Sequence, residues 1–543
     1  MGLTQTQIFY IVLFATGIVY LFGMQVDIMD VDAAQYASIS RDMLQSGSFL
    51  QVLERGHDYL DKPPLLFWLN ALSFFIFGVS NWSYKLPSVI FAIIGIYATY
   101  RFAMLYYSQQ IALFSAVVLA TCQAFFLITN DVRTDTILCG SIMLASWQLA
   151  AYFISGRKLN FIMAFVAMGF ALLTKGPIGL FTILFAFGTH ILLTRDWKQI
   201  LRWEWLLGLV IIGIMLTPMC IGLYQQYGIR GLRFYFWTQS FGRITGESSW
   251  ANNPDPLFLF HSFLWSFLPW SFFFLLGMGW HIKTLWKQKF KLNSGQEAIT
   301  IGGILLSYLA LSRSAYQLPH YIYVILPYAA VVTSHYMIAV FGTHRNTIFY
   351  KSMTILQFAF LLLLFVLGFL LSFICFEAQT WQWGLFVYFV VATILIIWKI
   401  SGTDKLIYAS LLTILAVNFF MSSHIYPNIL KYQADNTIGR YVTDNEIKRA
   451  QMAVYGEHSH SLDFYAGFVV PEIYSQKELA RYASKKGGFC FIYPSGIEQL
   501  ATLNIPCDTI LKLKDYHVTQ LTLPFLNPRT RDSKLNTCYL VRF

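Results

Sequence analysis

Long apolar stretches recur along this chain from the N-terminus to about residue 422, and they constrain its fold more than any other feature. The first of them, "IFYIVLFATGIVYLFGM" over residues 8–24, is close to the roughly 20 residues with which an α-helix crosses a bilayer. Hydrophobic residues make up 57% of the sequence and charged residues only 12%, and the mean hydropathy is +0.55. Since soluble globular proteins do not have such a composition, we predict an α-helical polytopic membrane protein.

The sequence becomes more polar after the last apolar stretch. Between residues 440 and 543, strand-like runs such as "GFCFIYP" and "CYLVRF" alternate with helix-like runs such as "SQKELARYASKKG". This alternation is typical of a small α/β domain. We therefore predict a membrane domain over residues 1–430 and a soluble α/β domain over residues 440–543.

The basic residues indicate how the spans are oriented. If the apolar segment 62–78 lies in the membrane interface, within a first outer loop over residues 25–85, the spans number about thirteen. Most Lys and Arg residues then fall in loops on one side, which the positive-inside rule assigns to the cytoplasm. We therefore expect the N-terminus in the cytoplasm and the C-terminal domain outside. The net charge of +11 is spread through these short loops, so we predict contacts with membrane lipids and no nucleic-acid partner.

The cysteines indicate no metal centre. The seven Cys residues lack the spacing of metal ligands, so we predict no structural zinc site. A disulfide within the tail, among Cys490, Cys507 and Cys538, would require an oxidising compartment, and the sequence leaves this open. The tail carries no nucleotide-binding or nucleophile motif, and we expect an accessory role for it.

Charged residues that are far apart in the sequence share the outer rim in this topology. They are Asp30, Asp32, Asp61, Lys62, Asp131, Asp135, Lys175 and Arg243, with Tyr321 beside them. Ionisable residues next to membrane spans are costly unless they serve a function, so their convergence predicts a site at the outer face. Taken singly, Lys175 and Arg243 could instead be interfacial or surface residues. Arg133 could form only a local ion pair with Asp131, and we expect His320 to be a hydrogen-bonded packing residue.

The residue types in this predicted site point to phosphate chemistry. A carboxylate can act as a general base or hold a hydroxyl, and Lys or Arg beside Tyr can bind a phosphate. Nucleotides are not available outside a bacterial cytoplasmic membrane, so the phosphate met there would be that of a lipid carrier. The site therefore predicts group transfer from a polyprenyl phosphate.

Several motifs carry a resemblance to a known family. In chain order they are "DVDAAQYASISRDMLQSGSFL", "YLDKPPLLFW", "YKLPSV", "RTDTIL", "ALLTKGPIGL", "FLPWS" and "QLPHYIYVILP". Together they resemble membrane glycosyltransferases of the GT-C fold, within the superfamily of aminoarabinose transferases and protein mannosyltransferases that use polyprenyl-phosphate sugars. The resemblance implies an inverting transferase of the bacterial inner membrane, with about thirteen transmembrane helices and an active site and C-terminal domain that face the periplasm.

The resemblance also implies roles for single residues. The catalytic acid of the first loop matches Asp32, followed by Tyr36, and the second acidic position, which we also predict to be catalytic, matches Asp135. The lysine that contacts the carrier phosphate matches Lys62, and the tyrosine of the Leu-Pro-x-Tyr motif matches Tyr321. We add Arg243 to the phosphate-binding group, and we predict substrate-positioning roles for Asp30, Tyr59, Asp61 and Lys175 as well as Tyr36.

The sequence departs from the family pattern in three places. Ala33 stands where the family commonly has Glu, and Asp61 replaces the usual Glu before Lys-Pro-Pro. We therefore predict no metal ligands, and leave a requirement for a divalent cation open. Tyr316 and Gln317 replace basic residues before Leu-Pro, which leaves the acceptor open.

The predicted reaction moves a sugar from undecaprenyl phosphate to lipid A or another part of lipopolysaccharide. In this hypothesis Lys62, Arg243 and Tyr321 neutralise the leaving phosphate, and Asp32 faces the anomeric carbon. If the acceptor is a hydroxyl, Asp32 takes its proton; if it is a phosphate, Asp32 orients it. The alternatives are transfer to protein Ser/Thr or to a surface glycan, and a transporter for lipid-linked glycans, which should instead place charges near the bilayer midplane.

Overall fold

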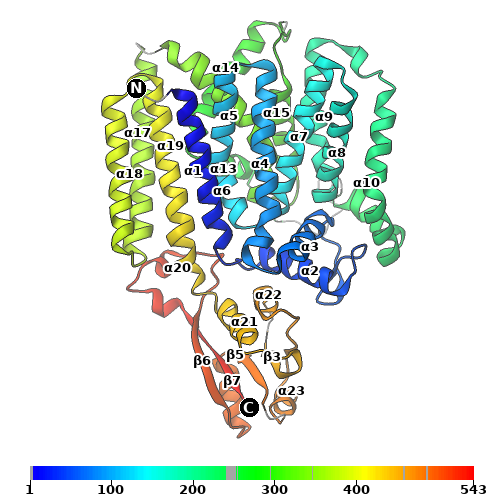
Figure 1. The fold of residues 1–543 in the computed structure, drawn as a ribbon, viewed down its shortest axis with the longest axis vertical. Coiled ribbons are helices and arrows are strands. Elements are labelled where there is room, and N and C mark those ends of the chain that lie inside the picture. The colour runs from blue at the N-terminus through cyan, green and yellow to red at the C-terminus, as the bar shows by residue number, and fades with distance from the viewer. Residues whose placement is uncertain are drawn as a thin grey trace.

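The computed structural model of this chain describes residues 4–239, 242, 252, 255–293, 295–344, 347–456, 459–484 and 487–543. Most of its helices run side by side in one bundle (Figure 1). A smaller region with a β-sheet follows beyond one end of this bundle, and the N-terminus lies at the opposite end (Figure 1). The fold is thus mainly helical, with a small C-terminal α/β region, as the sequence predicts.

Nine helical segments of the described residues are each long and apolar enough to cross a membrane. They are α1 (Gln5–Gln25), α4 (Asn81–Tyr106), α7 (Thr134–Ser155), α8 (Lys158–Lys175), α10 (Glu204–Tyr227), α18 (Thr380–Lys399) and three composite segments. The composite segments are η3 (Pro319–Ile325), α16 (Leu326–His335) and η4 (Tyr336–Val340); α17 (Ile348–Phe369) and η6 (Leu370–Ile374); and α19 (Thr403–Phe420), η7 (Met421–Ile425) and α20 (Tyr426–Leu430).

Two further spans are bent. α5 (Gln109–Thr121) and α6 (Gln123–Asn130) meet at 51°, and α13 (Phe258–Ser266) and α14 (Ser271–Lys287) meet at 117°. The second bend contains Pro269, which cannot continue a helix because it lacks a backbone N–H. Two shorter apolar helices, α9 (Ile178–Thr194) and α15 (Ile299–Ser312), pack against each other. The described residues thus hold nine such segments, or eleven if each bent pair is one span, and the predicted number of about thirteen stays a prediction.

The loop between α1 and α4 lies at the end of the bundle nearest the C-terminal region (Figure 1). It contains α2 (Asp32–Ser46), the strand pair β1 (Leu53–Glu54) and β2 (His57–Asp58), and α3 (Leu65–Phe77). Helix α3 has 13 residues, a length of about 20 Å, which is too short to cross a hydrocarbon core of about 30 Å. It exposes apolar side chains such as Phe75, of which 74% is accessible. This geometry fits the interfacial position predicted for residues 62–78.

The C-terminal region is built around a five-stranded mixed sheet with the strand order β4-β3-β5-β7-β6. Strand β3 (Met452–Tyr455) runs parallel to β4 (Glu472–Ile473) and β5 (Phe489–Ile492), whereas β7 (Asn536–Arg542) is antiparallel to β5 and β6 (Asp508–Asp515). The helices of this region are α21 (Ala434–Asp444), α22 (His460–Ala466), α23 (Gln476–Ala483), α24 (Pro494–Thr502) and α25 (Leu523–Leu526). Its short helical elements are η8 (Arg449–Gln451) and η9 (Arg531–Lys534), and those of the membrane domain are α11 (Ile229–Arg233), η1 (Trp197–Gln199), η2 (Phe234–Thr238) and η5 (Phe341–His344).

The C-terminal region is attached to the first loop through several buried contacts. Arg41 of α2 is 1% exposed and donates to the backbone carbonyls of Asp463 and Phe464 in α22. Arg55 forms ion pairs with Asp463 and Glu472. Because a buried charge is costly without partners, these contacts fix the first loop against the C-terminal region.

All seven cysteines are free thiols in this fold.

Candidate active site

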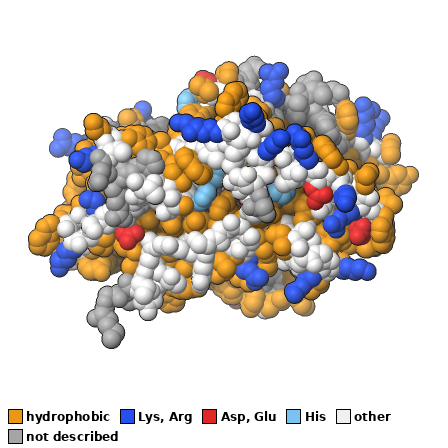
Figure 2. Space-filling view, turned by 90° about the horizontal axis from the view of Figure 1, so that it is seen from above, with side chains coloured by type: hydrophobic (Ala, Val, Ile, Leu, Met, Phe, Trp, Pro, Cys, Tyr) orange, Lys and Arg blue, Asp and Glu red, His pale blue; other side chains and the backbone are white. Residues whose placement is uncertain are grey.

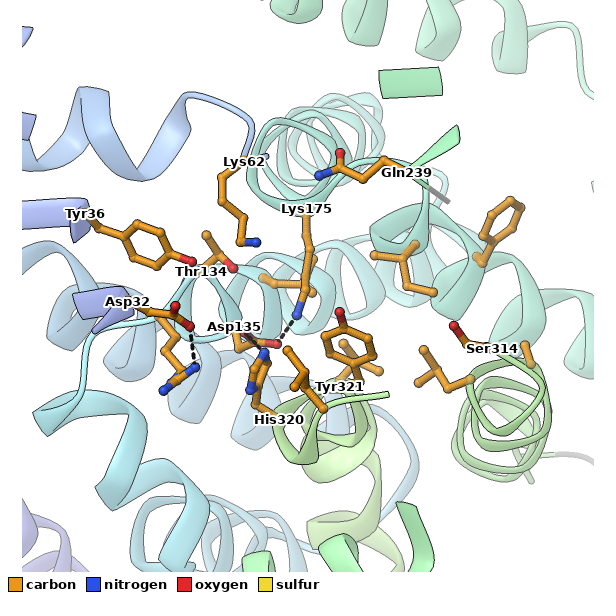
Figure 3. Close-up of a pocket in the computed structure, with 18 residues that line it drawn as sticks. Asp32, Tyr36, Lys62, Thr134, Asp135, Lys175, Gln239, Ser314, His320 and Tyr321 are labelled. Carbon is orange, nitrogen blue, oxygen red and sulfur yellow. Dashed lines mark hydrogen bonds and ion pairs between the residues drawn. The ribbon is translucent and has the colours of Figure 1, made fainter. Parts of the chain in front are cut away.

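A cavity of about 100 Å³ opens at the end of the bundle where the first loop lies. Residues from five separate segments line it (Figure 3). Its charged and polar lining consists of Asp32, Tyr36, Lys62, Arg133, Thr134, Asp135, Lys175, Gln239, Ser314, His320 and Tyr321. We call it the first cavity. Six of the residues predicted for the site, far apart in sequence, thus lie together: Asp32, Tyr36, Lys62, Asp135, Lys175 and Tyr321.

Asp32 is positioned by the way α1 ends and α2 begins. The buried Lys85 of α4 donates from Nζ to the carbonyl oxygens of Gly23 and Val26, at 3.0 and 2.7 Å, and so satisfies the end of α1. The Tyr84 hydroxyl donates to the Ala33 carbonyl at 2.6 Å. Asp32 is the first residue of α2, where a carboxylate is favoured by the helix dipole.

Two other side chains of the site are placed by helix ends. Arg133 immediately precedes α7, and Asp135 lies in the first turn of that helix. Lys175 is the last residue of α8. The helix stops there because Gly176 has a φ of 74°, a conformation that glycine adopts at little cost, and Pro177 follows. The sequence "TKGP" therefore places Lys175 at the edge of the cavity.

Arg133 joins two carboxylates. Its Nη1 lies 2.9 Å from Asp32 Oδ2, and its Nε lies 2.9 Å from Asp131 Oδ2. The neighbouring charge of Asp131, followed by that of Asp32, raises the pKa of Arg133 above its ordinary value although burial opposes this. The guanidinium therefore stays protonated and fixes the side chain of Asp32 at the rim of the first cavity.

Asp135 is deeply buried, with 1% of its side chain exposed. Lys175 Nζ lies 2.6 Å from Asp135 Oδ1, and His320 Nε2 lies 3.8 Å from Oδ2. The ammonium group of Lys175 also lies 4.4 Å from the centre of the Tyr321 ring, within the range of a cation–π interaction. A carboxylate and an aromatic ring thus hold the Lys175 side chain at the first cavity. Figure 3 shows its ammonium group and that of Lys62 pointing into the cavity.

A second cavity, of about 710 Å³, lies beside the first. Asp32, Lys62, Arg133, Leu318 and His320 line both cavities and form the wall between them. Lys62 forms an ion pair with Asp61, and Gln239 donates to the backbone carbonyl of Asp61. Asp61 and Tyr59, both predicted to position substrate, line the second cavity.

The two tyrosines of the first loop support the site. The rings of Tyr36 and Tyr59 pack edge-on against Phe67, with centroids 5.9 and 6.1 Å away. Burial is the main cause that raises the pKa of each phenol above its ordinary value, and nearby carboxylates raise it further. Both phenols therefore remain neutral hydrogen-bonding groups.

The remaining predicted residues are placed differently. Asp30 lies at the junction with the C-terminal region, where its backbone N–H donates to Gln433 Oε1 at 3.0 Å. Asp30 is not in the described lining of either cavity, and its predicted role stays a prediction. Arg243 lies outside the described residues, so its predicted role stays a prediction.

Sequence reasoning assigned no site role to five polar residues of the first cavity: Arg133, Thr134, Gln239, Ser314 and His320. Arg133 stands between two aspartates in "NDVRTD", and this spacing suggested only the local pair with Asp131. His320 lies between the proline and tyrosine of "LPHY", a motif that had already placed Tyr321. Gln239 carries no motif of its own.

The described residues do not fit a resident metal ion. No three carboxylate, imidazole or thiol side chains among them are arranged so that they could hold one metal ion. Asp32, Asp61 and Asp135 are each paired with a basic side chain.

Comparisons with known proteins show which families this chain is similar to. The family model described as dolichyl-phosphate-mannose-protein mannosyltransferase matches residues 61–221. An undecaprenyl phosphate-alpha-4-amino-4-deoxy-L-arabinose arabinosyl transferase of Erwinia tasmaniensis is 24% identical over 335 residues, which cover 61% of this chain and 58% of the relative. The corresponding transferase of Shewanella sediminis is 25% identical over 265 residues, 45% of each chain. The chain thus matches about half of the length of these two transferases.

A solved structure covers the whole chain. The crystal structure of ArnT from Cupriavidus metallidurans, bound to undecaprenyl phosphate, has a TM-score of 0.71, covers 98% of this chain and 97% of its own, and is 16% identical. At this identity the similarity shows the fold, which is the GT-C fold. The comparisons confirm the predicted resemblance to aminoarabinose-transferase-like membrane glycosyltransferases of the GT-C fold, and the relatives support the glycosyltransferase class of enzyme.

Proposed function

We propose that this protein is an inverting glycosyltransferase that moves a sugar from a polyprenyl (undecaprenyl) phosphate carrier to lipid A or another part of lipopolysaccharide. The reaction would take place at the periplasmic face of the bacterial inner membrane. The observation that carries the proposal is the first cavity, because it combines basic side chains with an apolar wall. The geometry of the site and the relatives support this choice of donor and acceptor.

The composition of the first cavity suits a lipid phosphate. Lys62, Arg133 and Lys175 supply positive charge, and Tyr321 supplies a hydroxyl. The apolar part of the lining consists of Leu138, Ile178, Phe181, Ala310, Leu311, Leu318 and Val324. A ligand that fits both parts has an anionic head and a hydrocarbon tail, as a polyprenyl phosphate does.

The reaction follows from this placement. With the phosphate against Lys62 and Lys175, negative charge that develops as the sugar–phosphate bond breaks is stabilised in a site shielded from water. Asp32, at the wall between the cavities, faces the sugar from the side opposite the phosphate. Attack from that side would invert the anomeric carbon. Asp135 would act in the same site as the counter-ion that keeps Lys175 charged and in place.

The charge distribution supports a periplasmic site. Figure 2 shows the end of the bundle away from the C-terminal region, where Lys and Arg side chains are spread over the surface and acidic side chains are few. By the positive-inside rule this end would face the cytoplasm. The cavities, which lie at the other end, would then face the periplasm.

Protein Ser/Thr and surface glycans remain as alternative acceptors, and a transporter is the less favoured alternative class. A transporter should bind its cargo near the bilayer midplane. The ionisable residues of this site instead lie at helix ends: Asp32 begins α2, Asp135 lies in the first turn of α7, and Lys175 ends α8.

Reconstituted protein provides the direct test. Full-length protein in liposomes is supplied with undecaprenyl phosphate carrying a radiolabelled monosaccharide, and with lipopolysaccharide. We expect protein-dependent transfer that Lys62→Ala abolishes and that Lys351→Ala, at the opposite end of the bundle, leaves intact. Undiminished turnover in a well-folded Lys62→Ala protein would overturn the assigned site. Mass spectrometry of lipid A and exported glycoproteins from cells lacking the protein would identify the acceptor class.

A further inference from the structure

The two cavities differ in charge although they share a wall. The described lining of the first cavity has three basic side chains, Lys62, Arg133 and Lys175, and two acidic ones, Asp32 and Asp135. The described lining of the second cavity has two basic side chains, Lys62 and Arg133, and three acidic ones: Asp32, Asp61 and Asp131. Basic residues are therefore in excess on the donor side and acidic residues on the other side.

The two basic side chains of the second cavity are already engaged. Lys62 is paired with Asp61, and Arg133 is paired with both Asp32 and Asp131. A phosphate that entered this cavity would have to displace a carboxylate from one of them. It would also meet three carboxylates at close range, and like charges disfavour each other strongly where water is partly excluded.

The rest of the second cavity is suited to hydroxyl groups. Carboxylates accept hydrogen bonds from hydroxyls, and Gln35 adds an amide. Aromatic side chains complete the lining: Tyr59, Trp265, Tyr316, Tyr323 and Tyr426. Such rings bury apolar faces of a ligand while their polar tips can still form hydrogen bonds. Sugars present both kinds of surface, with C–H faces and hydroxyl edges.

We propose that the second cavity binds the acceptor and that the acceptor group is a hydroxyl of an uncharged sugar residue, not a phosphate. This inference rests on the proposed transferase function and specifies its acceptor. It also assigns a role to the position of Asp32, which lines both cavities. With 40% of its side chain exposed, Asp32 can be reached from the acceptor side.

The transfer of the sugar needs only the polyprenyl-phosphate donor and the acceptor hydroxyl. The acceptor hydroxyl gives its proton to the Asp32 carboxylate, and its oxygen forms a bond to the anomeric carbon. The bond between that carbon and the phosphate oxygen breaks, and the polyprenyl phosphate leaves with the electron pair. The proton then passes from Asp32 to water. A phosphate acceptor would already be ionised and would not need this base.

The linkage in the product tests the inference. Membranes containing the full-length protein receive undecaprenyl phosphate that carries a radiolabelled monosaccharide, and unused donor is removed by chromatography. Membranes containing Lys62→Ala protein serve as the blank. The labelled product is then divided between mild acid, which hydrolyses glycosyl phosphates, and alkaline β-elimination, which releases sugars from Ser and Thr.

Label that resists both treatments and is released only by hydrolysis of a sugar–sugar bond is the expected result. Release by mild acid would show a phosphate acceptor, and release by β-elimination would show a peptide acceptor. Either result overturns this inference and leaves the transferase function standing. The absence of any protein-dependent product with a panel of labelled donors would overturn the transferase function and the inference together.

Discussion

Arg133 Nη1 lies 2.9 Å from Asp32 Oδ2, and this ion pair joins the first residue of α2 to the residue before α7, 101 positions later in the chain. A second contact from Arg133 Nε to Asp131 Oδ2, also 2.9 Å, holds the guanidinium in place. The orientation of the proposed base thus depends on a residue in a different span.

Replacing Arg133 should therefore reduce transfer strongly. Arg133→Ala leaves two carboxylates without their shared cation and releases the side chain of Asp32. We expect a loss of about 100-fold in kcat, the size seen when a positioned charge is removed from an active site. Arg133→Lys should recover part of it, because an ammonium can pair with one carboxylate. Arg101→Ala, at the far end of α4, is the control. Activity within threefold of the unsubstituted protein in Arg133→Ala would contradict the role.

Asp32→Asn tests the base itself. It keeps the size of the side chain but removes its ability to take a proton, so we expect kcat to fall by about 100-fold or more. Asp42→Asn is a matched control, because Asp42 lies in the same helix and pairs with Arg41. Kinetics are measured with saturating donor. Equal losses in the two variants would indicate a general effect on α2 instead.

Variants of Asp135 and Lys175 should show how much of a loss of transfer comes from lower stability and how much from weaker phosphate binding. Asp135→Asn leaves the ammonium of Lys175 buried without its counter-ion, and we expect a loss of about 3–5 kcal/mol in the free energy of unfolding. In the double variant Asp135→Asn, Lys175→Gln, no unpaired charge remains, so thermal stability should recover while transfer stays low. Thermal unfolding in detergent and transfer assays measure the two properties. Recovery of transfer in the double variant would exclude Lys175 from phosphate binding.

Two glycines of α10 offer a paired test of how that helix supports the first loop. A Cβ at Gly222 would collide with the backbone carbonyl of Leu50, whereas a Cβ at Gly213 would meet nothing within 4 Å. Gly222→Ala should push the loop away and lower stability by about 1–3 kcal/mol. Gly213→Ala should be neutral or stabilising by up to about 1 kcal/mol, since alanine favours the helix. The same midpoint of thermal unfolding in both variants would show that the backbone at Leu50 can move away without a loss of stability.

The C-terminal region should lose stability as the pH rises. Burial, followed by the charges of Asp515 and Asp30, raises the pKa of Asp435 well above its ordinary value. The folded state therefore binds a proton that the unfolded chain has already released, so the stabilisation is complete below about pH 4 and is lost as the pH rises through the raised pKa. Asp435→Asn should remove this slope in thermal unfolding between pH 4 and 8. If the pH dependence of thermal unfolding is unchanged in Asp435→Asn, groups other than Asp435 cause it.

Much of the fold could be predicted because its signals are local. Apolar stretches of the right length predicted the spans, and alternating runs in the tail predicted the strands β5 and β7. The motif "TKGP" also predicts where α8 ends, since its glycine and proline follow Lys175 directly. These features depend on neighbouring residues, which the sequence displays.

The pairings inside the site could not be predicted in the same way. Arg133 lies two positions from Asp131, so the sequence suggested that local pair, but its contact with Asp32 depends on how α2 and α7 are arranged. Asp30 and Asp32 are two residues apart, yet one meets the C-terminal region and the other lines both cavities. The separation of the charges into two cavities is likewise a property of the packed bundle.

The contacts of Arg41 and Arg55 with Asp463 make the C-terminal region part of the scaffold for the transfer chemistry, although its own strands and helices line neither cavity among the described residues. A chimera that exchanged this region for that of a relative would also change the surface against which α2 packs. New specificity in this protein would accordingly require the extramembrane portion and the first loop to be redesigned as one unit.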